Sequence, residues 1–408
     1  MNGPGRLTVV GIGAEGHAGL APAAAEALAR ATVVVGAPRQ LGLLPESLAA
    51  RRVRLPTPLR EGLPGLLAEL AADPGLGGVA VLASGDPMFH GIGVTLARLL
   101  GPGRLRVLPA PSSAALACAR LGWALHDTPV VSLVTGEVAE VAAVADRGRR
   151  FLVLARDAGS IAAVAAVLAA RDPGAGLTLL ADLGAAGERI AHGTAAAPPE
   201  PAGALRILAV TPTAPARAWL ADADFDTDGQ LTKSPIRELT LAALGPGPGR
   251  LLWDIGGGTG SIAIEWARHG GRAACLERDP DRVRRIRGNA ARLAPVTVVE
   301  GTAPGDLGLL AGCGAPEAIF IGGGLTAPGL VDACAAALAP GGRLVANAVT
   351  VESERVLWAA RERHGGEIRR VQVDHPGKVG AFTVLRPALP VTQWIADPPP
   401  PGGGGGAP

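Results

Sequence analysis

Residues 251–261 read Leu-Leu-Trp-Asp-Ile-Gly-Gly-Gly-Thr-Gly-Ser, and this stretch decides the fold of the second half of the chain. Its first five residues predict an apolar strand, its glycines predict a tight turn, and residues 262–269 predict a helix. A second predicted strand ends in an acid, Glu277. This succession of strand, glycine turn, helix and distal acid is the layout of a nucleoside cofactor site in a doubly wound α/β sheet.

The position of Asp254 indicates which cofactor this turn binds. A dinucleotide-binding turn usually reads G-x-G-x-x-G directly after the strand, whereas here an acid precedes the glycines and gives D-x-G-x-G-x-G. The pattern resembles that of class I methyltransferases, which use S-adenosylmethionine (SAM). Asp254 suits the ammonium of SAM and Glu277 suits both ribose hydroxyls, while the glycines let the backbone approach the ligand. A nicotinamide enzyme and a glycine turn without a ligand are the alternatives.

The composition argues against several classes of partner. The chain has 408 residues, enough for two or three domains, and its net charge of +2 creates no global field toward nucleic acid or a membrane. Four cysteines form no C-x-x-C pair and seven histidines form no ligand cluster, so we expect reduced thiols, a cytoplasmic location and no metal. No signal-peptide pattern is present, and the longest apolar helix, near residues 160–170, is too short to span a bilayer.

Strand and helix patterns alternate along the whole chain, which predicts an α/β protein. We predict a first domain over residues 1–215, with lobes over about 1–110 and 111–215. A second domain follows over residues 216–395, and the Pro/Gly tail 396–408 is expected to be disordered. Strands are predicted at residues 7–10, 32–35, 79–83, 106–108, 130–133, 150–154, 177–180, 205–210, 251–255, 273–276, 296–299, 318–321, 343–346 and 381–385.

Further motifs extend the predicted site of the second domain. Glu300-Gly301-Thr302-Ala303 follows a strand, where an adenine usually meets backbone and a small side chain, and Phe320-Ile321-Gly322-Gly323-Gly324 ends the next strand at the ligand crevice. Asn347 is placed to reach the substrate from the same crevice. The predicted SAM contacts of this domain are Thr232, Asp254, Gly256, Gly257, Gly258, Thr259, Gly260, Glu277, Gly301, Thr302 and Ala303.

Four segments of the second domain carry a more specific resemblance. They read DGQLTK at residues 228–233, WDIGGGTGS at 253–261, FIGGGLT at 320–326 and LVANAVT at 344–350. Together with Pro390-Val391-Thr392-Gln393-Trp394, they resemble the decarboxylating precorrin methyltransferases of corrin biosynthesis. The resemblance covers residues 222–395.

The first domain contains a second constellation of turns. Gly11-Ile12-Gly13, Ser84-Gly85-Asp86-Pro87 and Pro109-Ala110-Pro111-Ser112-Ser113 occur in an order that resembles the tetrapyrrole methylase family. In that family SAM binds in a cleft between two α/β lobes, which implies a second SAM site here. Its implied contacts are Gly11, Gly13, Gly85, Asp86 and Ser112. Residues 134–137 read Val-Thr-Gly-Glu and depart from the His-Gly-Arg-like segment of that family.

The two domains together resemble the family of decarboxylating precorrin-6Y C5,15-methyltransferases. The resemblance implies methylation of a reduced tetrapyrrole at carbon 5 by the first domain. It implies methylation at carbon 15, with loss of CO2 from the ring C acetate, by the second domain, giving precorrin-8X in cobalamin biosynthesis. It also implies one SAM per domain, no nucleic-acid or membrane partner, a homo-oligomer, and transient contact with neighbouring pathway enzymes.

Two alternatives stay open. In the first, the first domain binds SAM or tetrapyrrole as a scaffold without catalysis, which the segment 134–137 motivates. In the second, the chain is a class I methyltransferase that acts on RNA or protein, although the basic segment 278–287 lacks interleaved aromatic residues. No catalytic residue is assigned; His90, Glu352 and Lys378 are polar candidates.

Overall fold

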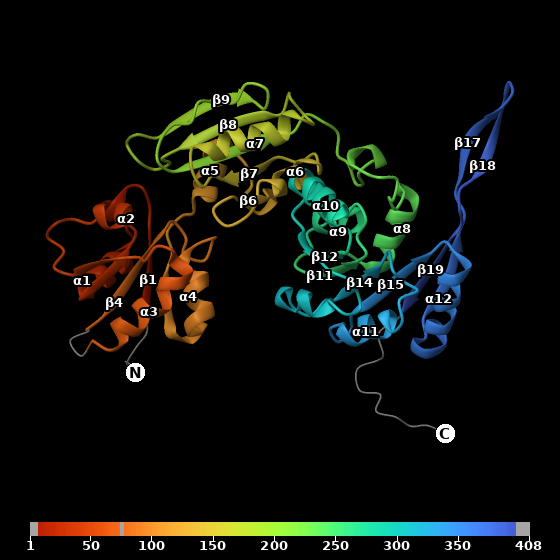
Figure 1. Ribbon diagram of the computed structural model, residues 1–408. Coiled ribbons are helices and arrows are strands. Elements are labelled where there is room, and N and C mark those ends of the chain that lie inside the picture. The colour runs from red at the N-terminus through yellow and green to blue at the C-terminus, as the bar shows by residue number, and fades with distance from the viewer. Residues whose placement is uncertain (1–6, 74–76, 397–408) are drawn as a thin grey trace. The chain divides into compact units, whose positions relative to one another are not determined.

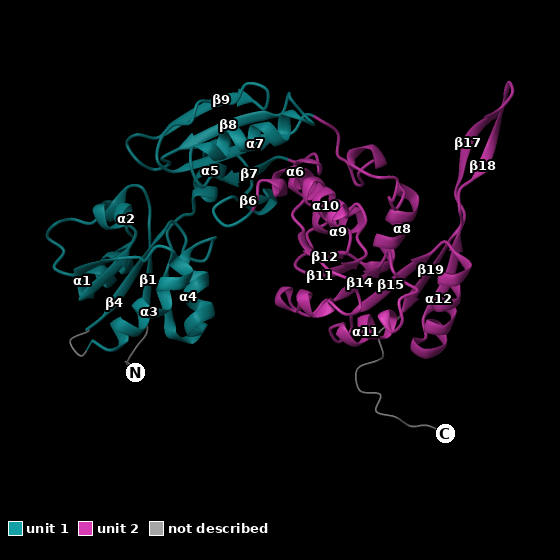
Figure 2. Ribbon diagram, viewed as in Figure 1, with its two compact units in different colours: residues 1–136, 150–213 teal, residues 137–149, 214–408 magenta. Residues whose placement is uncertain are grey.

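The computed structural model describes residues 7–73 and 77–396, which form two compact units (Figure 1, Figure 2). The first unit takes the residues up to 136 and residues 150–213, and the second takes residues 137–149 and those from 214 onward. The segment 137–149 thus packs with the second unit. The predicted domain boundary at residues 215 and 216 is a separate statement about the family domains, and it stays a prediction. The predicted tail, residues 396–408, lies outside the described residues except for Ala396.

The first lobe of the first unit is a parallel five-stranded sheet with apolar side chains on both faces. Its strand order is β3-β2-β4-β1-β5. Val10 and Leu82 pack with the helices α1 and α2, whereas Val9 and Val81 pack with α3 and α4, because successive side chains of a strand point to opposite faces. The bounds are β1 (Leu7–Ile12), β2 (Val33–Gly36), β3 (Arg51–Arg54), β4 (Val79–Ser84), β5 (Leu105–Leu108), α1 (Pro22–Arg30), α2 (Pro38–Gly42), α3 (Leu59–Ala71) and α4 (Ile92–Leu100).

The second lobe of the first unit is a mixed sheet of order β6-β7-β10-β8-β9. β6 and β7 are parallel, and the remaining neighbours are antiparallel. Leu152, Leu180 and Ile207 of this sheet pack against Ala114 and Ala117 of α5. The bounds are β6 (Val130–Ser132), β7 (Phe151–Leu154), β8 (Gly176–Ala181), β9 (Arg189–Thr194), β10 (Arg206–Thr211), α5 (Ser113–Leu121) and α7 (Gly159–Ala169).

The second unit is built on a seven-stranded sheet of order β13-β12-β11-β14-β15-β19-β16. The first five strands are parallel, and β19 runs antiparallel to both of its neighbours. The strand order reverses between β11 and β14, which makes their carboxyl ends the expected ligand crevice. The bounds are β11 (Leu251–Ile255), β12 (Arg272–Glu277), β13 (Thr297–Glu300), β14 (Ala318–Ile321), β15 (Arg343–Ala348), β16 (Glu367–Val371) and β19 (Val391–Ala396).

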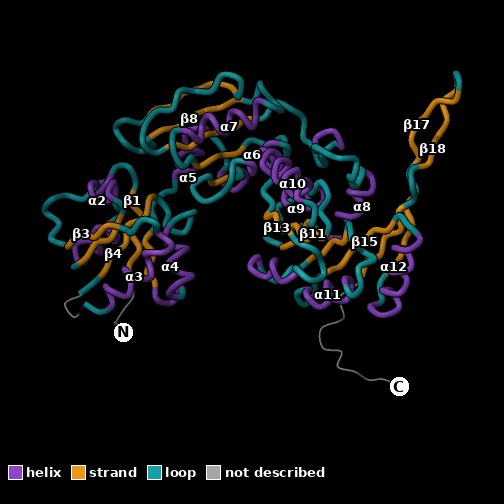
Figure 3. Tube along the Cα trace, in the orientation of Figure 1, coloured by secondary structure: helices purple, strands orange, loops and turns teal. Residues whose placement is uncertain are grey.

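Helices cover both faces of this sheet. Leu251 and Trp253 pack with α11 and α12, whereas Leu252 packs with α8 and α9, so the alternation of the strand directs Asp254 to the α9 face. A hairpin of β17 and β18 extends away from the sheet and exposes Phe382 and Leu385 (Figure 1, Figure 3). The bounds are α6 (Ala139–Ala145), α8 (Ser234–Leu244), α9 (Ser261–Arg268), α10 (Pro280–Leu293), α11 (Leu330–Ala337), α12 (Val351–His364), β17 (Asp374–Val379) and β18 (Phe382–Pro387).

The predicted α/β class is confirmed, and each predicted strand is found with its ends within two residues of the prediction. The strands that the sequence did not predict are β3, β9, β16, β17 and β19. The first three lie at sheet edges and carry arginine or histidine, so they lack the apolar period that marks a strand. Across residues 7–73 and 77–396, no helix has both the length and the apolar character needed to cross a membrane.

A buried ion network ties the helices of the second unit together. Glu265 on α9 lies between Arg237 of α8, 3.6 Å away, and Arg268, 2.6 Å away. Arg268 in turn reaches Asp146 at 2.9 Å, just after α6. Arg237 and Glu265 are fully buried, and Glu265 also accepts the backbone N–H of Leu220 at 2.7 Å. The network therefore fixes α6, α8, α9 and the segment before α8 relative to one another.

We expect Glu265→Ala to lower the free energy of unfolding of the second unit by about 3–5 kcal/mol, because two buried arginines lose their shared counter-charge. Urea unfolding followed by tryptophan fluorescence measures this change, since five tryptophans of the second unit dominate the signal. They are Trp219, Trp253, Trp266, Trp358 and Trp394. Asp281→Ala, which breaks the exposed pair with Arg284, is the control and should cost less than about 1 kcal/mol. Equal losses in the two variants would contradict a role for burial.

Candidate active sites

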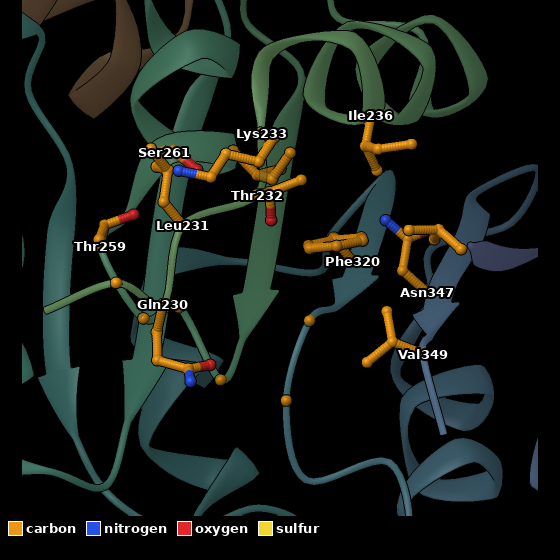
Figure 4. A pocket seen from close by; sticks show the side chains of 18 of the residues that line it. Gln230, Leu231, Thr232, Lys233, Ile236, Thr259, Ser261, Phe320, Asn347 and Val349 are labelled. Atoms are coloured by element: carbon orange, nitrogen blue, oxygen red, sulfur yellow. The ribbon is translucent and has the colours of Figure 1, made fainter. Parts of the chain in front are cut away.

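The second unit contains a pocket of about 420 Å³ at the carboxyl ends of β11, β14 and β15 (Figure 4). Side chains of the segment before α8, of the glycine loop and of the strand ends surround it. Among the predicted SAM contacts, those that line this pocket are Thr232, Asp254, Gly256, Gly257, Gly258 and Thr259. Phe320 and Asn347, singled out in the sequence as part of the crevice, line it too. The crevice expected from the strand order is therefore a real cavity.

Glycine is required in the loop after β11 for two different reasons. Gly256 has a φ of +72°, and an added Cβ would lie 2.7 Å from the Cα of Gly323. At Gly257 an added Cβ would lie 2.0 Å from the sulfur of the buried Cys275. The first residue needs a left-handed backbone, and the second lets the loop lie directly on β12. Both keep the pocket floor free of side chains.

Asp254 lines this pocket and has a raised pKa. It is only 1 % exposed. One carboxylate oxygen, Oδ2, accepts the backbone N–H of Ala263 at 3.2 Å, and the other, Oδ1, has no hydrogen-bond partner among the described residues. Burial raises the pKa of Asp254 to about 7, and the charge of Glu277 adds to the rise. A buried acceptor without a donor is costly, so this position suits a cationic ligand group.

Glu277 lies at the end of β12 but does not line the pocket. Its Oε2 accepts the N–H of Gly258 at 2.9 Å, and its Oε1 accepts the N–H groups of Arg278 and Asp279 at 2.9 and 3.0 Å. The carboxylate thus braces the glycine loop, and its contact with a ribose stays a prediction. Four other predicted contacts also fall outside the pocket lining: Gly260, Gly301, Thr302 and Ala303.

The first unit contains its own pocket of about 400 Å³, lined by residues of both lobes. Gly13, Gly85 and Ser112 line it, and the Ser112 hydroxyl also caps α5 by accepting the N–H of Ala115 at 3.1 Å. Gly11 and Asp86 do not line it. A Cβ at Gly11 would lie 2.1 Å from the carbonyl oxygen of Gly85, so that glycine serves the close packing of two loops. Asp86 accepts the N–H of Met88 at 2.8 Å and shapes the turn.

Each of the two units matches the model of a known protein family. A model of tetrapyrrole (corrin/porphyrin) methylases matches residues 6–199, and a model of the precorrin methyltransferase domain matches residues 223–397. The precorrin-6Y C(5,15)-methyltransferase [decarboxylating] of Mycobacterium tuberculosis H37Rv is 46 % identical over 95 % of this chain and 98 % of its own length. The chain belongs to the precorrin-6Y C(5,15)-methyltransferase [decarboxylating] family. The resemblance inferred from the sequence motifs is confirmed.

Two further relatives of this family are similar to the chain. The enzyme of the same name from Sinorhizobium sp. is 42 % identical over 95 % of this chain and 95 % of its own length. The crystal structure of the C-terminal domain of precorrin-6Y C5,15-methyltransferase from Rhodobacter capsulatus is 44 % identical. It aligns with 44 % of this chain and 99 % of its own, with a TM-score of 0.42.

Several basic residues of the two pockets were not predicted from the sequence. Arg282 and His375 line the second-unit pocket, and Arg156 and Arg206 line the first-unit pocket. The arginines were not singled out because arginine is abundant along the whole chain. His375 was not singled out because it lies on β17, a strand that the sequence did not predict. Of the three polar candidates, His90 lines the first-unit pocket with a φ of +52°. Glu352 and Lys378 do not line the second-unit pocket.

We expect Gly257→Ala to destabilise the second unit by about 1–3 kcal/mol, because the new methyl overlaps the Cys275 sulfur in a closely packed interior. The double variant Gly257→Ala/Cys275→Ala removes that sulfur and should lose clearly less than the sum of the two single variants. Urea unfolding of the three variants gives the coupling. Strictly additive losses would show that the contact between residues 257 and 275 does not set the position of the loop.

Proposed function

We propose that this chain methylates a precorrin at carbons 5 and 15 with loss of CO2, as its family name describes, and that the CO2 comes from the ring C acetate. The first unit serves carbon 5, and the second serves carbon 15 and the decarboxylation. The observation that carries the proposal is that each unit has its own pocket beside the glycine turn of its own family motif. Two pockets support two methyl transfers on one chain.

In the second unit, Asp254 supports SAM as the ligand. Its unpartnered Oδ1 fits the ammonium of the methionine part, and the pocket wall of Thr232 and the glycine loop fits the rest of the molecule. SAM supplies an already activated methyl group. The protein then gains most by holding the nucleophilic carbon in line with that methyl, through proximity and orientation. No covalent catalyst is needed for the transfer.

Loss of CO2 from an acetate needs an electron sink conjugated to it, and a protonated macrocycle provides one. The chain therefore has to hold the acetate in position and keep the macrocycle protonated. The basic residues Lys233, Arg282 and His375 line the pocket, and Arg282 also pairs with Asp228 at 2.9 Å. Because a precorrin carries many carboxylates, cationic side chains around the pocket support this class of substrate.

In the first unit, Arg156 and Arg206 give the pocket two guanidinium groups for substrate carboxylates. Their own bonds are to backbone carbonyls: Arg156 donates to Gly136 at 3.3 Å and Arg206 donates to Ala202 at 3.0 Å. A guanidinium that donates to a neutral carbonyl is not neutralised by that bond, so its positive charge can still attract an anion. The first unit therefore has the features of a tetrapyrrole-binding site, which catalysis at carbon 5 requires and which a binding scaffold would share. One SAM per unit, a homo-oligomer and transient pathway contacts complete the proposal.

Mass spectrometry of the product tests this function most directly. The full chain is incubated anaerobically with SAM and the reduced precorrin substrate. We expect the product to gain two methyl groups and lose one CO2. One methyl with CO2 loss would assign catalysis to the second unit alone and leave the first as a binding scaffold. An unchanged substrate with SAM bound would overturn the proposed function.

We expect Asp254→Ala and Glu277→Ala to weaken SAM binding at the second unit by about 10- to 100-fold while sparing the first. The first variant removes a charge-assisted hydrogen bond worth about 1.5–3 kcal/mol, and the second releases the glycine loop. Titration calorimetry should show two SAM per chain in the wild type and one in each variant at moderate concentration. Unchanged binding at both sites would contradict the assignment.

The pH dependence of the same titration provides the control. Because the pKa of Asp254 is raised to about 7, its proton must leave before the carboxylate can meet a cation. Affinity at the second unit should therefore increase as the pH rises from 6 to 7.5, with a flatter profile above. In Asp254→Asn the increase should disappear, since no proton remains to be displaced.

A further inference from the structure

A chain of three polar side chains runs along one rung of the second-unit sheet. Asn347 on β15 is paired with Gln393 on β19, and Gln393 is paired with Arg369 on β16. Gln393 donates from Nε2 to Oδ1 of Asn347 at 2.8 Å, and Arg369 donates from Nε to Oε1 of Gln393 at 2.9 Å. The motif Pro390–Trp394, noted in the sequence without a role, supplies the middle member.

Thr240 of α8 closes this chain from the helix side. Its hydroxyl oxygen lies 3.0 Å from Nδ2 of Asn347 and 3.0 Å from Nε2 of Gln393. The same hydroxyl donates its proton to the carbonyl of Ile236 at 2.7 Å. With its proton committed, the oxygen of Thr240 can only accept, and so both amides must turn their NH2 groups toward it.

The direction of the hydrogen bonds in this network is also fixed at Arg369. The guanidinium of Arg369 has only donors, so Gln393 must turn its carbonyl oxygen to Arg369 and its NH2 group inward. The orientations of both amides thus follow from a donor-only group and an acceptor-only group. Thr240 is 0 % exposed and Gln393 1 %, so water cannot replace a mismatched partner and the wrong orientation is costly.

Asn347 is the member that reaches the pocket, where it lies close to Phe320 and Val349 (Figure 4). Its oxygen is used by Gln393, and one of its two N–H groups is used by Thr240. The hydrogen bonds among the described residues leave its second N–H for a ligand. The pocket therefore meets this side chain as a neutral donor.

We propose that Gln393, together with Thr240 and Arg369, is a positioning residue that locks the Asn347 amide so that it donates an N–H to a carboxylate of the tetrapyrrole substrate. The inference rests on the proposed function of the second unit. A carboxylate is the matching partner because it accepts only. If the amide of Asn347 were reversed, its oxygen would replace the donor and repel the same carboxylate.

Gln393→Glu tests the polarity with little change of shape. A glutamate still accepts from Arg369, but it cannot donate to Asn347 or Thr240, and its oxygen faces the oxygen of Asn347. The Asn347 amide relieves this repulsion by turning over, provided that Thr240 gives its hydroxyl proton to the Asn347 oxygen instead of to the carbonyl of Ile236. We expect KM for the precorrin in the second-unit reactions to rise about tenfold, with a smaller change in kcat, since the lost contact is one hydrogen bond to a charged group. CO2 release and methylation at carbon 15 are the measured rates.

The controls separate positioning from general damage. Methylation at carbon 5 by the first unit is measured in the same reaction and should be unchanged, as should the number of SAM bound. Gln372→Glu, at an exposed glutamine on the same part of the chain, introduces the same charge and should leave KM unchanged. An unaltered KM in folded Gln393→Glu protein, or a loss that follows SAM binding, would overturn the proposal.

A second pair of variants keeps the test decisive if Gln393→Glu does not fold. Thr240→Val removes the acceptor that both amides share, whereas Thr240→Ser restores it. We expect Thr240→Val to raise KM and Thr240→Ser to recover most of the wild-type value; equal values would overturn the proposal. Failure of the wild type to release CO2 would instead refute the proposed function, so the two outcomes are distinguishable.

Discussion

The carboxylate of Glu265 is the interaction on which the second unit depends. It is fully buried between Arg237 and Arg268, and each arginine carries the constraint to a different element. Arg237 binds the carbonyls of Leu220 and Thr232, so the wall of the pocket before α8 is held by the same charge cluster that holds α9. Since α9 begins directly after the glycine loop, the same ion network positions both the wall and the loop.

The pocket inside this frame offers ligands two opposite kinds of polar group. Asp254 presents a buried acceptor without a donor, and Asn347 presents a donor whose orientation its neighbours impose. A cation is drawn to the first and an anion to the second. The pocket can therefore hold a cationic cofactor group and an acidic substrate at once without placing like charges together.

The fold could be predicted from the sequence where a run of apolar residues clearly marked a buried strand. The apolar runs of β11 and β14 and the D-x-G-x-G-x-G turn led directly to the pocket of Asp254 and Thr232. The prediction of the family rested on motifs, and the comparison with known proteins confirms it. Side-chain direction was beyond reach: Glu277 turns back onto its own loop, and the partners of Gln393 lie on elements distant in the chain. Arg156 and Arg206 were hidden because a chain so rich in arginine gives each one little weight.

The position of α6 has a consequence for synthesis on the ribosome. Asp146 binds Arg268, which follows it by 122 residues. At a rate of about 5–20 residues per second, Arg268 is synthesised roughly 6 to 24 s after Asp146. During this interval the strands around it can complete the first unit while α6 stays undocked. The alanines and the valine that α6 buries in the folded protein therefore stay exposed on the nascent chain during this interval. A chaperone would be of most use at this stage.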